Sequence, residues 1–347
     1  MNVLVTGGAG YIGSHACQRL VRDGHTVVAL DSLDRGHREP MALLGADDPE
    51  SLLTFVEGTV GDRQLVSRLL AEHAIDTVMH FAALAYVGES VDDPMRYYRT
   101  NVEAGVALVD ACVDAPAVTR FIFSSSCATY GDPPEGMVPV PESCPQVPTS
   151  PYGRTKLMLE DVLRDTARAC AQSSRDLRVA MLRYFNVAGS DRSGTLGEDH
   201  TPETHLIPVA IHAAMGKRDH MSIFGTDYPT ADGTCVRDYV HVEDLIDAHV
   251  RVAERLESAP TEPLAYNVGI GLGYSVREVL DAVKRVSGVE FEVREAPRRT
   301  GDAVALYAEP AKIQAELGWH AQVTDLDEIV ASAWRWMSAH PAGYAGA

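Results

Sequence analysis

Short apolar runs alternate with longer periodic segments from the start of the chain to about Phe185. This alternation is the βαβ pattern of a parallel sheet covered by helices. We therefore expect an α/β protein whose apolar runs build a doubly wound parallel sheet. The predicted strands are Val3–Thr6, Thr26–Asp31, Leu53–Glu57, Thr77–Ala82, Arg120–Ser125 and Val179–Phe185, and the predicted helices lie near Ile12–Arg22, Arg63–Glu72, Pro94–Val113 and Tyr152–Ala171.

The pattern loosens after Asn186, where Gly- and Pro-rich stretches near residues 191–204 and 225–233 separate shorter elements. We expect residues 1–186 to form one domain around the sheet. Residues 187–347 are expected to form a smaller C-terminal α/β domain, with some chain crossing between the two. At 347 residues the chain is long enough to bury a sizeable core without disulfides.

The charge balance narrows the set of partners. The chain has 30 Lys and Arg against 49 Asp and Glu, a formal charge of -19. Such a charge repels phosphate backbones and anionic lipid headgroups, so we expect neither a nucleic acid nor a membrane as partner. An anionic small substrate would have to be bound by a few local arginines.

The six cysteines are scattered and form no C-x-x-C pair, which indicates reduced thiols. The chain opens directly on a strand-like segment without a signal-peptide pattern, and no apolar run reaches about 18 residues. We therefore expect a cytoplasmic protein. We also expect no metal site, because the 13 histidines include no H-E-x-x-H motif; His241, with the acidic residues that follow it, and the pair His205 and His212 are typical of structural contacts.

A glycine-rich turn from Gly7 to Gly13 follows the first predicted strand and opens the first predicted helix. Glycines let the backbone turn sharply and approach a pyrophosphate, while the helix amino terminus offers N–H groups and a favourable dipole. Asp31 closes the next strand, where a carboxylate accepts hydrogen bonds from both ribose hydroxyls and repels a 2′-phosphate. Ser32 adds no positive charge. The sequence therefore predicts an NAD site rather than an NADP site.

A second motif begins at Ser150, where Ser as N-cap and Pro at the first helical position start a helix. Tyr152 and Lys156 share one face of it at i,i+4 spacing. A nearby ammonium and the positive ring of a nicotinamide stabilise a phenolate, and lowering a phenol pKa from about 10 to near 7 requires roughly 4 kcal/mol. We expect Tyr152 to act as a general base. Ser126, at the end of the strand before it, could hydrogen-bond the same substrate oxygen.

These motifs give the chain a resemblance to the extended short-chain dehydrogenase/reductases, and within them to the UDP-hexose 4-epimerases. The resemblance covers nearly the whole chain. It rests on Val5–His15, His80–Ala83, Val87–Ser90, Ser124–Ser126, Ser150–Gly153, Arg183–Asn186 and Val236–Tyr239.

The resemblance implies an enzyme of galactose metabolism that interconverts UDP-galactose and UDP-glucose. Tyr152 would take the proton of the sugar 4-hydroxyl while C4 gives a hydride to tightly bound NAD, and the hydride would return to the other face of a 4-keto sugar. Lys156 would tune Tyr152 and hold the nicotinamide ribose, and Ser126 would steady the reacting oxygen. The family's dimers also imply a homodimer.

The resemblance further assigns residues to each ligand. Residues 1–186 would form the NAD-binding Rossmann domain and residues 187–347 the UDP-sugar-binding domain. The implied cofactor-binding residues are Gly7, Gly10, Tyr11, Ile12, Gly13, Asp31, Ser32, Thr59, Val60, Phe81, Ala82, Ala83, Asn101, Lys156, Tyr184 and Phe185. The implied substrate-binding residues are Ser126, Tyr152, Asn186, Leu206, Phe224, Arg237, Arg299, Asp302 and Leu306, with the two arginines on the pyrophosphate, Phe224 beside the uracil and Asp302 on its ribose.

Leu306 departs from the family pattern in an informative way. At this position a bulky tyrosine is associated with exclusion of N-acetylated sugars, and leucine is smaller. The resemblance therefore extends the expected substrates to UDP-N-acetylhexosamines. Two smaller departures are Thr59, where relatives often carry an aspartate, and His205, where some carry an asparagine.

Two other functions compete with epimerisation. A related NAD-dependent nucleotide-sugar dehydratase or decarboxylase needs further acid and base groups, and dehydratases typically place Asp-Glu soon after the serine strand. This chain has Cys127–Tyr130 there, without an acidic residue. A catalytically inactive NAD-binding regulator is the other alternative. The intact Ser126, Tyr152 and Lys156 argue against it.

Overall fold

The computed structural model describes residues 1–299 and 302–346. The chain forms two compact units that are each discontinuous in sequence. Unit 1 comprises Met1–Thr129, Pro148–Arg183 and Ile246–Tyr266, and unit 2 comprises Tyr130–Val147, Tyr184–Leu245 and Asn267–Ala347.

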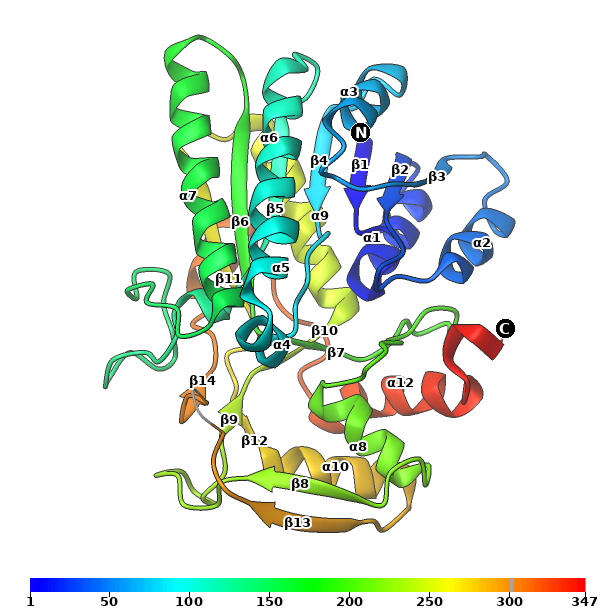
Figure 1. Cartoon of the computed structure of the whole chain (residues 1–347), viewed down its shortest axis with the longest axis vertical. Helices are drawn as coiled ribbons and strands as arrows, with labels where there is room; N and C mark the ends of the chain where they lie inside the picture. The colour runs from blue at the N-terminus through cyan, green and yellow to red at the C-terminus, as the bar shows by residue number, and fades with distance from the viewer. Residues whose placement is uncertain (300–301, 347) are drawn as a thin grey trace. The chain divides into compact units, whose positions relative to one another are not determined.

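A seven-stranded sheet of order β11-β6-β5-β4-β1-β2-β3 organises unit 1 (Figure 1). The strands from β3 to β5 along this order pair in parallel. Strand order reverses direction after β1, which defines a doubly wound Rossmann sheet and confirms the predicted fold class. The strands are β1 (Asn2–Thr6), β2 (Thr26–Asp31), β3 (Leu53–Glu57), β4 (Thr77–His80), β5 (Arg120–Ser126), β6 (Arg178–Tyr184) and β11 (Leu264–Val268).

All six predicted strands exist, but two details of the prediction are wrong. The sheet has a seventh strand, β11, supplied by the second half of the chain. Strand β4 ends at His80 rather than Ala82, because the N–H groups of Phe81 and Ala82 both donate to the carbonyl of Thr6 and turn the chain out of the ladder.

Helices α3, α6 and α7 pack on one face of this sheet around Leu69, Leu108, Phe121 and Leu159. The predicted helix Pro94–Val113 is not continuous, because a π-helical turn, Tyr98–Glu103, separates α5 from α6. Such turns are frequent at functional sites. The helices of unit 1 are α1 (Tyr11–Arg22), α2 (Arg38–Ala46), α3 (Arg63–Glu72), α4 (Val87–Asp92), α5 (Pro94–Tyr97), α6 (Ala104–Asp114), α7 (Pro151–Gln172) and α9 (Val242–Ser258), of which α9 begins in unit 2.

Unit 2 consists of short strands and of helices that pack around an apolar core including Ile207, Leu280, Ile329 and Trp336. A capping box between Ser275 and Glu278 starts its most amphipathic helix, α10. The helices are α8 (Leu206–Ala214), α10 (Val276–Ser287), α11 (Ala311–Leu317) and α12 (Leu326–Ala339); the strands are β7 (Asn186–Ala188), β8 (His220–Phe224), β9 (Val236–Arg237), β10 (Tyr239–His241), β12 (Tyr274–Ser275), β13 (Glu292–Ala296) and β14 (Ala305–Leu306).

No helix in the described part of the chain is both long enough and apolar enough to cross a bilayer.

Candidate active site

The glycine turn between β1 and α1 is held by two close backbone approaches. Gly7 has φ of +72°, and a Cβ there would lie 2.7 Å from the backbone N of Ala82. A Cβ on Gly13 would collide with the carbonyl of Gly7. Gly10 is the N-cap of α1 and has no side chain to occupy the helix amino terminus. The turn therefore leaves the start of α1 available to an anion, as the sequence predicts.

Asp31 is the last residue of β2, and its carboxylate is anchored to the glycine turn. Oδ2 accepts from the N–H of Ala9 at 3.0 Å and Oδ1 accepts from the N–H of Leu33 at 2.7 Å. Burial raises the pKa of Asp31, while hydrogen bonds from Leu33, Ala9 and Gly10 act to lower it. A carboxylate has about four lone-pair directions, and three N–H groups take three of them, so the anchored group can still accept from a ribose hydroxyl.

The other residues expected at the cofactor gather at the carboxyl edge of the sheet. Ser32 follows β2, Thr59 and Val60 follow β3, and Phe81–Ala83 follow β4. These strands are neighbours around β1 in a parallel sheet, and ligands bind at this edge in such folds. Tyr184 ends β6 at its carboxyl end, and Phe185 follows it.

Asn101, which the resemblance places at the cofactor, has several hydrogen-bond partners within unit 1. It is buried in the π-helical turn, where its side chain accepts from the N–H of Leu84 and donates to that residue's carbonyl and to Thr155 Oγ1. Asn101 thus fixes the segment that follows β4 against α7. Its contribution to a cofactor site is to hold that segment in place.

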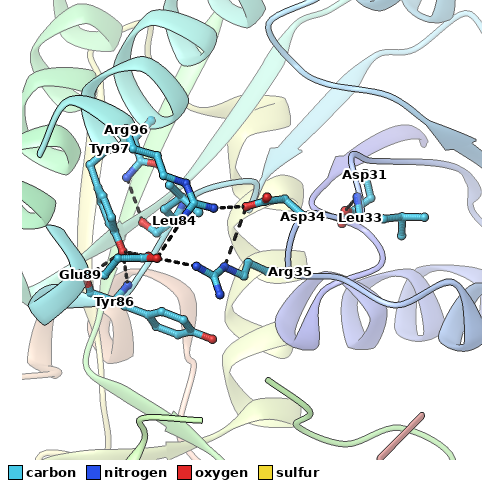
Figure 2. A network of polar contacts seen from close by, with 10 residues as sticks. Asp31, Leu33, Asp34, Arg35, Leu84, Tyr86, Glu89, Arg96 and Tyr97 are labelled. Carbon is cyan, nitrogen blue, oxygen red and sulfur yellow. Dashed lines mark hydrogen bonds and ion pairs between the residues drawn. The ribbon is translucent and has the colours of Figure 1, made fainter. Parts of the chain in front are cut away.

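A polar network that the sequence did not reveal ties the segment after β2 to the segment after β4 (Figure 2). Arg35 binds Glu89 at 2.6 Å, and Arg96 binds both Asp34 at 2.8 Å and Glu89 at 3.0 Å. Tyr97 Oη donates to Glu89 at 2.8 Å. The same two segments carry Ser32 and Phe81–Ala83. The network therefore joins two parts of the candidate cofactor site.

Ser126 and Tyr152 lie together in a buried setting in unit 1. Ser126 ends β5, and Tyr152 lies in the first turn of α7, whose N-cap Ser150 accepts from the N–H of Gly153 at 3.1 Å. Burial raises the pKa of Tyr152 to about 12, and its hydrogen bond with Ser126 opposes that rise. The protein groups by themselves thus leave the phenol pKa raised, and the expected lowering, which includes the charge of a bound nicotinamide, stays a prediction.

Lys156 lies one turn after Tyr152 and is also buried. Its Nζ donates to the carbonyl of Ser124 at 2.8 Å and lies 5.0 Å from the centre of the Phe123 ring and 5.8 Å from that of Tyr152. Burial lowers the pKa of Lys156 to about 7. The ammonium is thus held beside β5, where its protonation changes close to neutral pH.

A buried ion pair supports this arrangement and was not predicted from the sequence. Glu160, on α7, binds Arg183, on β6, through both carboxylate oxygens at 2.9 and 2.7 Å. Ser125 Oγ donates to Glu160 at 2.5 Å. Because Ser125 precedes Ser126 on β5, the pair fixes β5, β6 and α7 around the candidate base.

Five of the expected substrate-binding residues converge in unit 2. Asp302 lies 3.0 Å from Arg299 and 3.7 Å from Arg237. The guanidinium of Arg299 lies over the ring of Phe224 at 4.8 Å. Leu306 pairs with Arg237 across β14 and β9. Two arginines and an aromatic ring in one place suit a nucleoside diphosphate.

Asn186 and Leu206 stand outside this group of contacts. Asn186 begins β7 and donates its N–H to the carbonyl of Asp238 at 3.1 Å, while Leu206 begins α8. Asp238 is itself buried and accepts from the N–H groups of Ile270, Gly271 and Ala308. Asp238 therefore anchors the backbone immediately after Arg237.

The glycine turn, the acidic residue that closes β2 and the buried Ser126, Tyr152 and Lys156 define the class: a nicotinamide-dinucleotide-dependent enzyme on a doubly wound sheet. Sequence comparison then gives the family. The chain belongs to the NAD dependent epimerase/dehydratase family, whose pattern matches residues 3–269. The family description names NAD, which confirms the cofactor expected from Asp31.

Individual relatives align over almost the whole chain. A probable UDP-arabinose 4-epimerase 3 from Oryza sativa subsp. japonica is 44% identical over 99% of this chain and 84% of its own. A UDP-glucose 4-epimerase from Halalkalibacterium halodurans is 42% identical over 99% of this chain and 98% of its own. The crystal structure of a UDP-glucose-4-epimerase from Stenotrophomonas maltophila, with bound NAD and formylated UDP-arabinopyranose, is 40% identical, covers 99% of each chain and superposes with a TM-score of 0.92.

Proposed function

We propose that this chain is a UDP-hexose 4-epimerase that interconverts UDP-galactose and UDP-glucose through a 4-keto sugar. The observation that carries the proposal is the buried set of Ser126, Tyr152 and Lys156 at β5 and α7, in a member of this family. A buried phenol protected from bulk water is suited to reversible proton transfer. The 42% identity to a UDP-glucose 4-epimerase over nearly both full lengths supports the same reaction.

Bound NAD supplies a reversible hydride acceptor at the sugar C4. Tyr152 Oη removes the proton of the 4-hydroxyl and returns it once the sugar has presented its other face. Ser126 Oγ donates to the reacting oxygen, and its hydrogen bond with Tyr152 opposes the rise that burial gives to the pKa of the phenol. Lys156 holds positive charge or releases it near neutral pH, because burial brings its pKa to about 7. No proton or hydride is lost over a complete cycle.

The UDP moiety would be bound by unit 2. Arg237 and Arg299 would take the pyrophosphate oxygens, Phe224 would lie against the uracil, and Asp302 would accept from the ribose. In the absence of a ligand, Asp302 pairs with both arginines. This pairing supports the assignment, because a diphosphate would take the place of a carboxylate between the same two guanidinium groups.

The product of UDP-galactose tests the reaction type. Purified protein is incubated with UDP-galactose alone, and the nucleotide sugars are identified by NMR. We expect UDP-glucose at its equilibrium share. A 4-keto-6-deoxy sugar would instead identify a dehydratase, and no turnover would favour an inactive NAD-binding regulator. Release of carbon dioxide in a separate incubation with a UDP-uronic acid would identify a decarboxylase.

The substrate range should extend beyond unsubstituted hexoses. Leu306, opposite Arg237 across β9 and β14, is smaller than the tyrosine that the family pattern associates with exclusion of N-acetylated sugars. We therefore propose activity on UDP-N-acetylhexosamines. The 44% identity to a probable UDP-arabinose 4-epimerase supports UDP-arabinose as a further substrate. Parallel assays with UDP-galactose, a UDP-N-acetylhexosamine and UDP-arabinose test this substrate range. Leu306→Tyr should remove turnover of the UDP-N-acetylhexosamine while sparing that of UDP-galactose.

We further propose that residues 1–186 serve as the NAD-binding domain and residues 187–347 as the UDP-sugar-binding domain of a cytoplasmic homodimer. Exposed apolar side chains on the helices of unit 1, Val91, Met95, Val106 and Met158, suit a helical dimer interface. Six free thiols suit a reducing compartment. Light scattering after gel filtration tests the dimer, and replacing Met95 and Met158 with lysine should dissociate it.

A further inference from the structure

Four side chains that bear metal-binding groups converge in unit 2, on the segment that leads into α8. They are Glu198, His200, Glu203 and His205, and one ligand atom from each lies within 4.8 Å of all the others. The side chains of Glu198 and Glu203 are 5% and 6% exposed. Two carboxylates and two imidazoles thus face one point, with both carboxylates largely buried and the side chain of His205 44% exposed.

The separations between these atoms fit a tetrahedral ion. Ligands bound to Zn²⁺ at 2.0–2.2 Å in tetrahedral geometry lie about 3.3–3.5 Å apart. His200 Nδ1 lies 3.3 Å from Glu198 Oε1 and 3.5 Å from Glu203 Oε2. His205 Nδ1 lies 3.5 Å from Glu203 Oε1 and 2.6 Å from Glu198 Oε1. Three of these four nitrogen–oxygen distances lie in that range, with Glu203 facing His200 through Oε2 and His205 through Oε1, and the fourth needs to open by less than about 1 Å.

We propose that Glu198, His200, Glu203 and His205 form a binding site for a divalent transition-metal ion such as Zn²⁺. Imidazole nitrogens and carboxylate oxygens are established Zn²⁺ ligands, and two carboxylates balance the charge of the ion. The site rests on these side chains and not on the proposed epimerase function. It departs from the expectation drawn from the sequence, in which no metal was foreseen.

The ion has a structural role in this arrangement. Four protein ligands close a tetrahedral site and leave no position for a substrate. Glu203 Oε1 also accepts from the N–H groups of Thr204 at 2.6 Å and His205 at 2.7 Å. The ion therefore fixes the backbone at the start of α8, where Leu206 stands.

The alternative is a set of ion pairs without metal. Burial lowers the pKa of His200, but hydrogen bonds to Glu198 and Glu203 outweigh it and raise that pKa to about 10. Protonated histidines would then balance the two carboxylates. Metal binding distinguishes the two states, because an ion must displace these protons.

Metal titration of the purified holoenzyme tests the site. The protein is stripped with a chelator and titrated with Zn²⁺ by calorimetry, and the bound metal is counted by mass spectrometry. We expect one tight ion per chain, and His200→Gln and Glu203→Gln should each weaken its binding by at least about 100-fold. Glutamine at position 203 can still accept from the two N–H groups, so α8 keeps its start. His212→Gln, on α8 but outside the cluster, should bind as the unaltered protein does.

The visible spectrum of bound Co²⁺, measured together with circular dichroism, distinguishes loss of a metal ligand from misfolding. Co²⁺ in the unaltered protein should show the intense visible bands of tetrahedral coordination, and His200→Gln should lose them while keeping its circular dichroism. The proposal is overturned if the unaltered protein binds no Zn²⁺ saturably. It is equally overturned if both cluster variants bind Zn²⁺ as tightly as His212→Gln does.

Discussion

The reaction centre in unit 1 and the arginine group in unit 2 handle charge in opposite ways. Tyr152 and Lys156 are buried, and burial moves their pKa values to about 12 and about 7. In unit 2, Arg237 and Arg299 meet Asp302 nearer to solvent, where the side chain of Arg299 is 61% exposed. Burial in unit 1 makes proton transfer tunable, whereas the group in unit 2 offers two guanidinium groups to an anion.

The contrast also separates what each region contributes. Around Tyr152, the buried pair of Glu160 and Arg183 holds the scaffold, so changes there should affect stability. In the arginine group of unit 2, the ion pair between Arg299 and Asp302 is partly exposed, and Asp238 anchors the backbone after Arg237. Substitutions of these arginines should therefore affect ligand binding and leave folding nearly intact.

Removing the phenol hydroxyl should have the largest effect. In Tyr152→Phe the ring still fills its buried site, but the general base is lost. We expect turnover of UDP-galactose at saturation to fall by at least about 10³-fold, with bound NAD unchanged. Turnover is followed by a coupled UDP-glucose assay, and NAD is measured after acid release. Retention of more than a tenth of the activity would exclude Tyr152 as the base.

Breaking the buried pair should destabilise the fold. Glu160→Gln leaves the guanidinium of Arg183 buried beside a neutral amide, and we expect the free energy of unfolding to fall by about 3 kcal/mol. Urea denaturation at pH 7 measures this. Asp165→Asn, at an exposed position of α7, is the matched control and should stay within about 0.5 kcal/mol. An equal loss in both variants would remove the special role of the buried pair.

The same variant gives a pH test with a defined sign. Hydrogen bonds and charges of Arg183 outweigh burial and hold the pKa of Glu160 below its usual 4.5. Its stabilising contribution is therefore complete above about pH 4.5 and is lost as the pH falls through the lower pKa of the folded state. The difference in stability between the unaltered protein and Glu160→Gln should shrink as the solution is acidified below pH 4.5.

Neutralising an arginine of the unit 2 group should act on binding. Arg237→Gln should raise the KM for UDP-galactose about 10- to 100-fold, since a hydrogen bond to a charged group contributes about 1.5–3 kcal/mol. Its kcat and its urea midpoint should change little. Arg298→Gln, whose guanidinium binds Asp227, is the control. A fall in kcat at unchanged KM would assign Arg237 to the reaction centre instead.

Loosening the network between the two cofactor segments should have the smallest effect. Arg96→Gln removes ion pairs to Asp34 and Glu89, each contributing about 0.2–1 kcal/mol at a half-exposed position. We expect NAD to dissociate up to about 10-fold faster, as measured by the NAD that remains after timed gel filtration. Arg99→Gln, on the exposed face of the neighbouring π-helical turn, should not change the rate. Equal rates in both variants would show that the network does not retain NAD.

The sequence predicted the strands of unit 1 well because side chains of the central strands are buried in apolar runs, as in Asn2–Thr6 and Thr26–Asp31. It did not reveal β11, because Leu264–Val268 reaches the sheet from far along the chain. The π-helical turn at Asn101 leaves no mark in hydrophobic periodicity. The three-residue strands β7 and β10 are too short to form a pattern.

The candidate site likewise contains features that the sequence reveals and features that depend on the folded structure. Motifs with fixed local spacing, such as Gly7–Gly13 and Tyr152 with Lys156, could be read from the sequence. The pairing of Glu160 with Arg183 depends on the packing of α7 against β6 and could not. The burial that raises the pKa of Tyr152 could not be read from the sequence either, because burial is a property of the fold. The four side chains from Glu198 to His205 are two, three and two residues apart along the chain, and only the folded geometry brings them together.

The central claim is that one retained NAD stores the hydride of the sugar and returns it to the same carbon. UDP-galactose labelled with deuterium at C4 tests this directly when it reacts in the presence of a large excess of unlabelled NADH. The account predicts that UDP-glucose keeps its deuterium at C4, because the hydride never leaves the site. Loss of the deuterium from the product would contradict it.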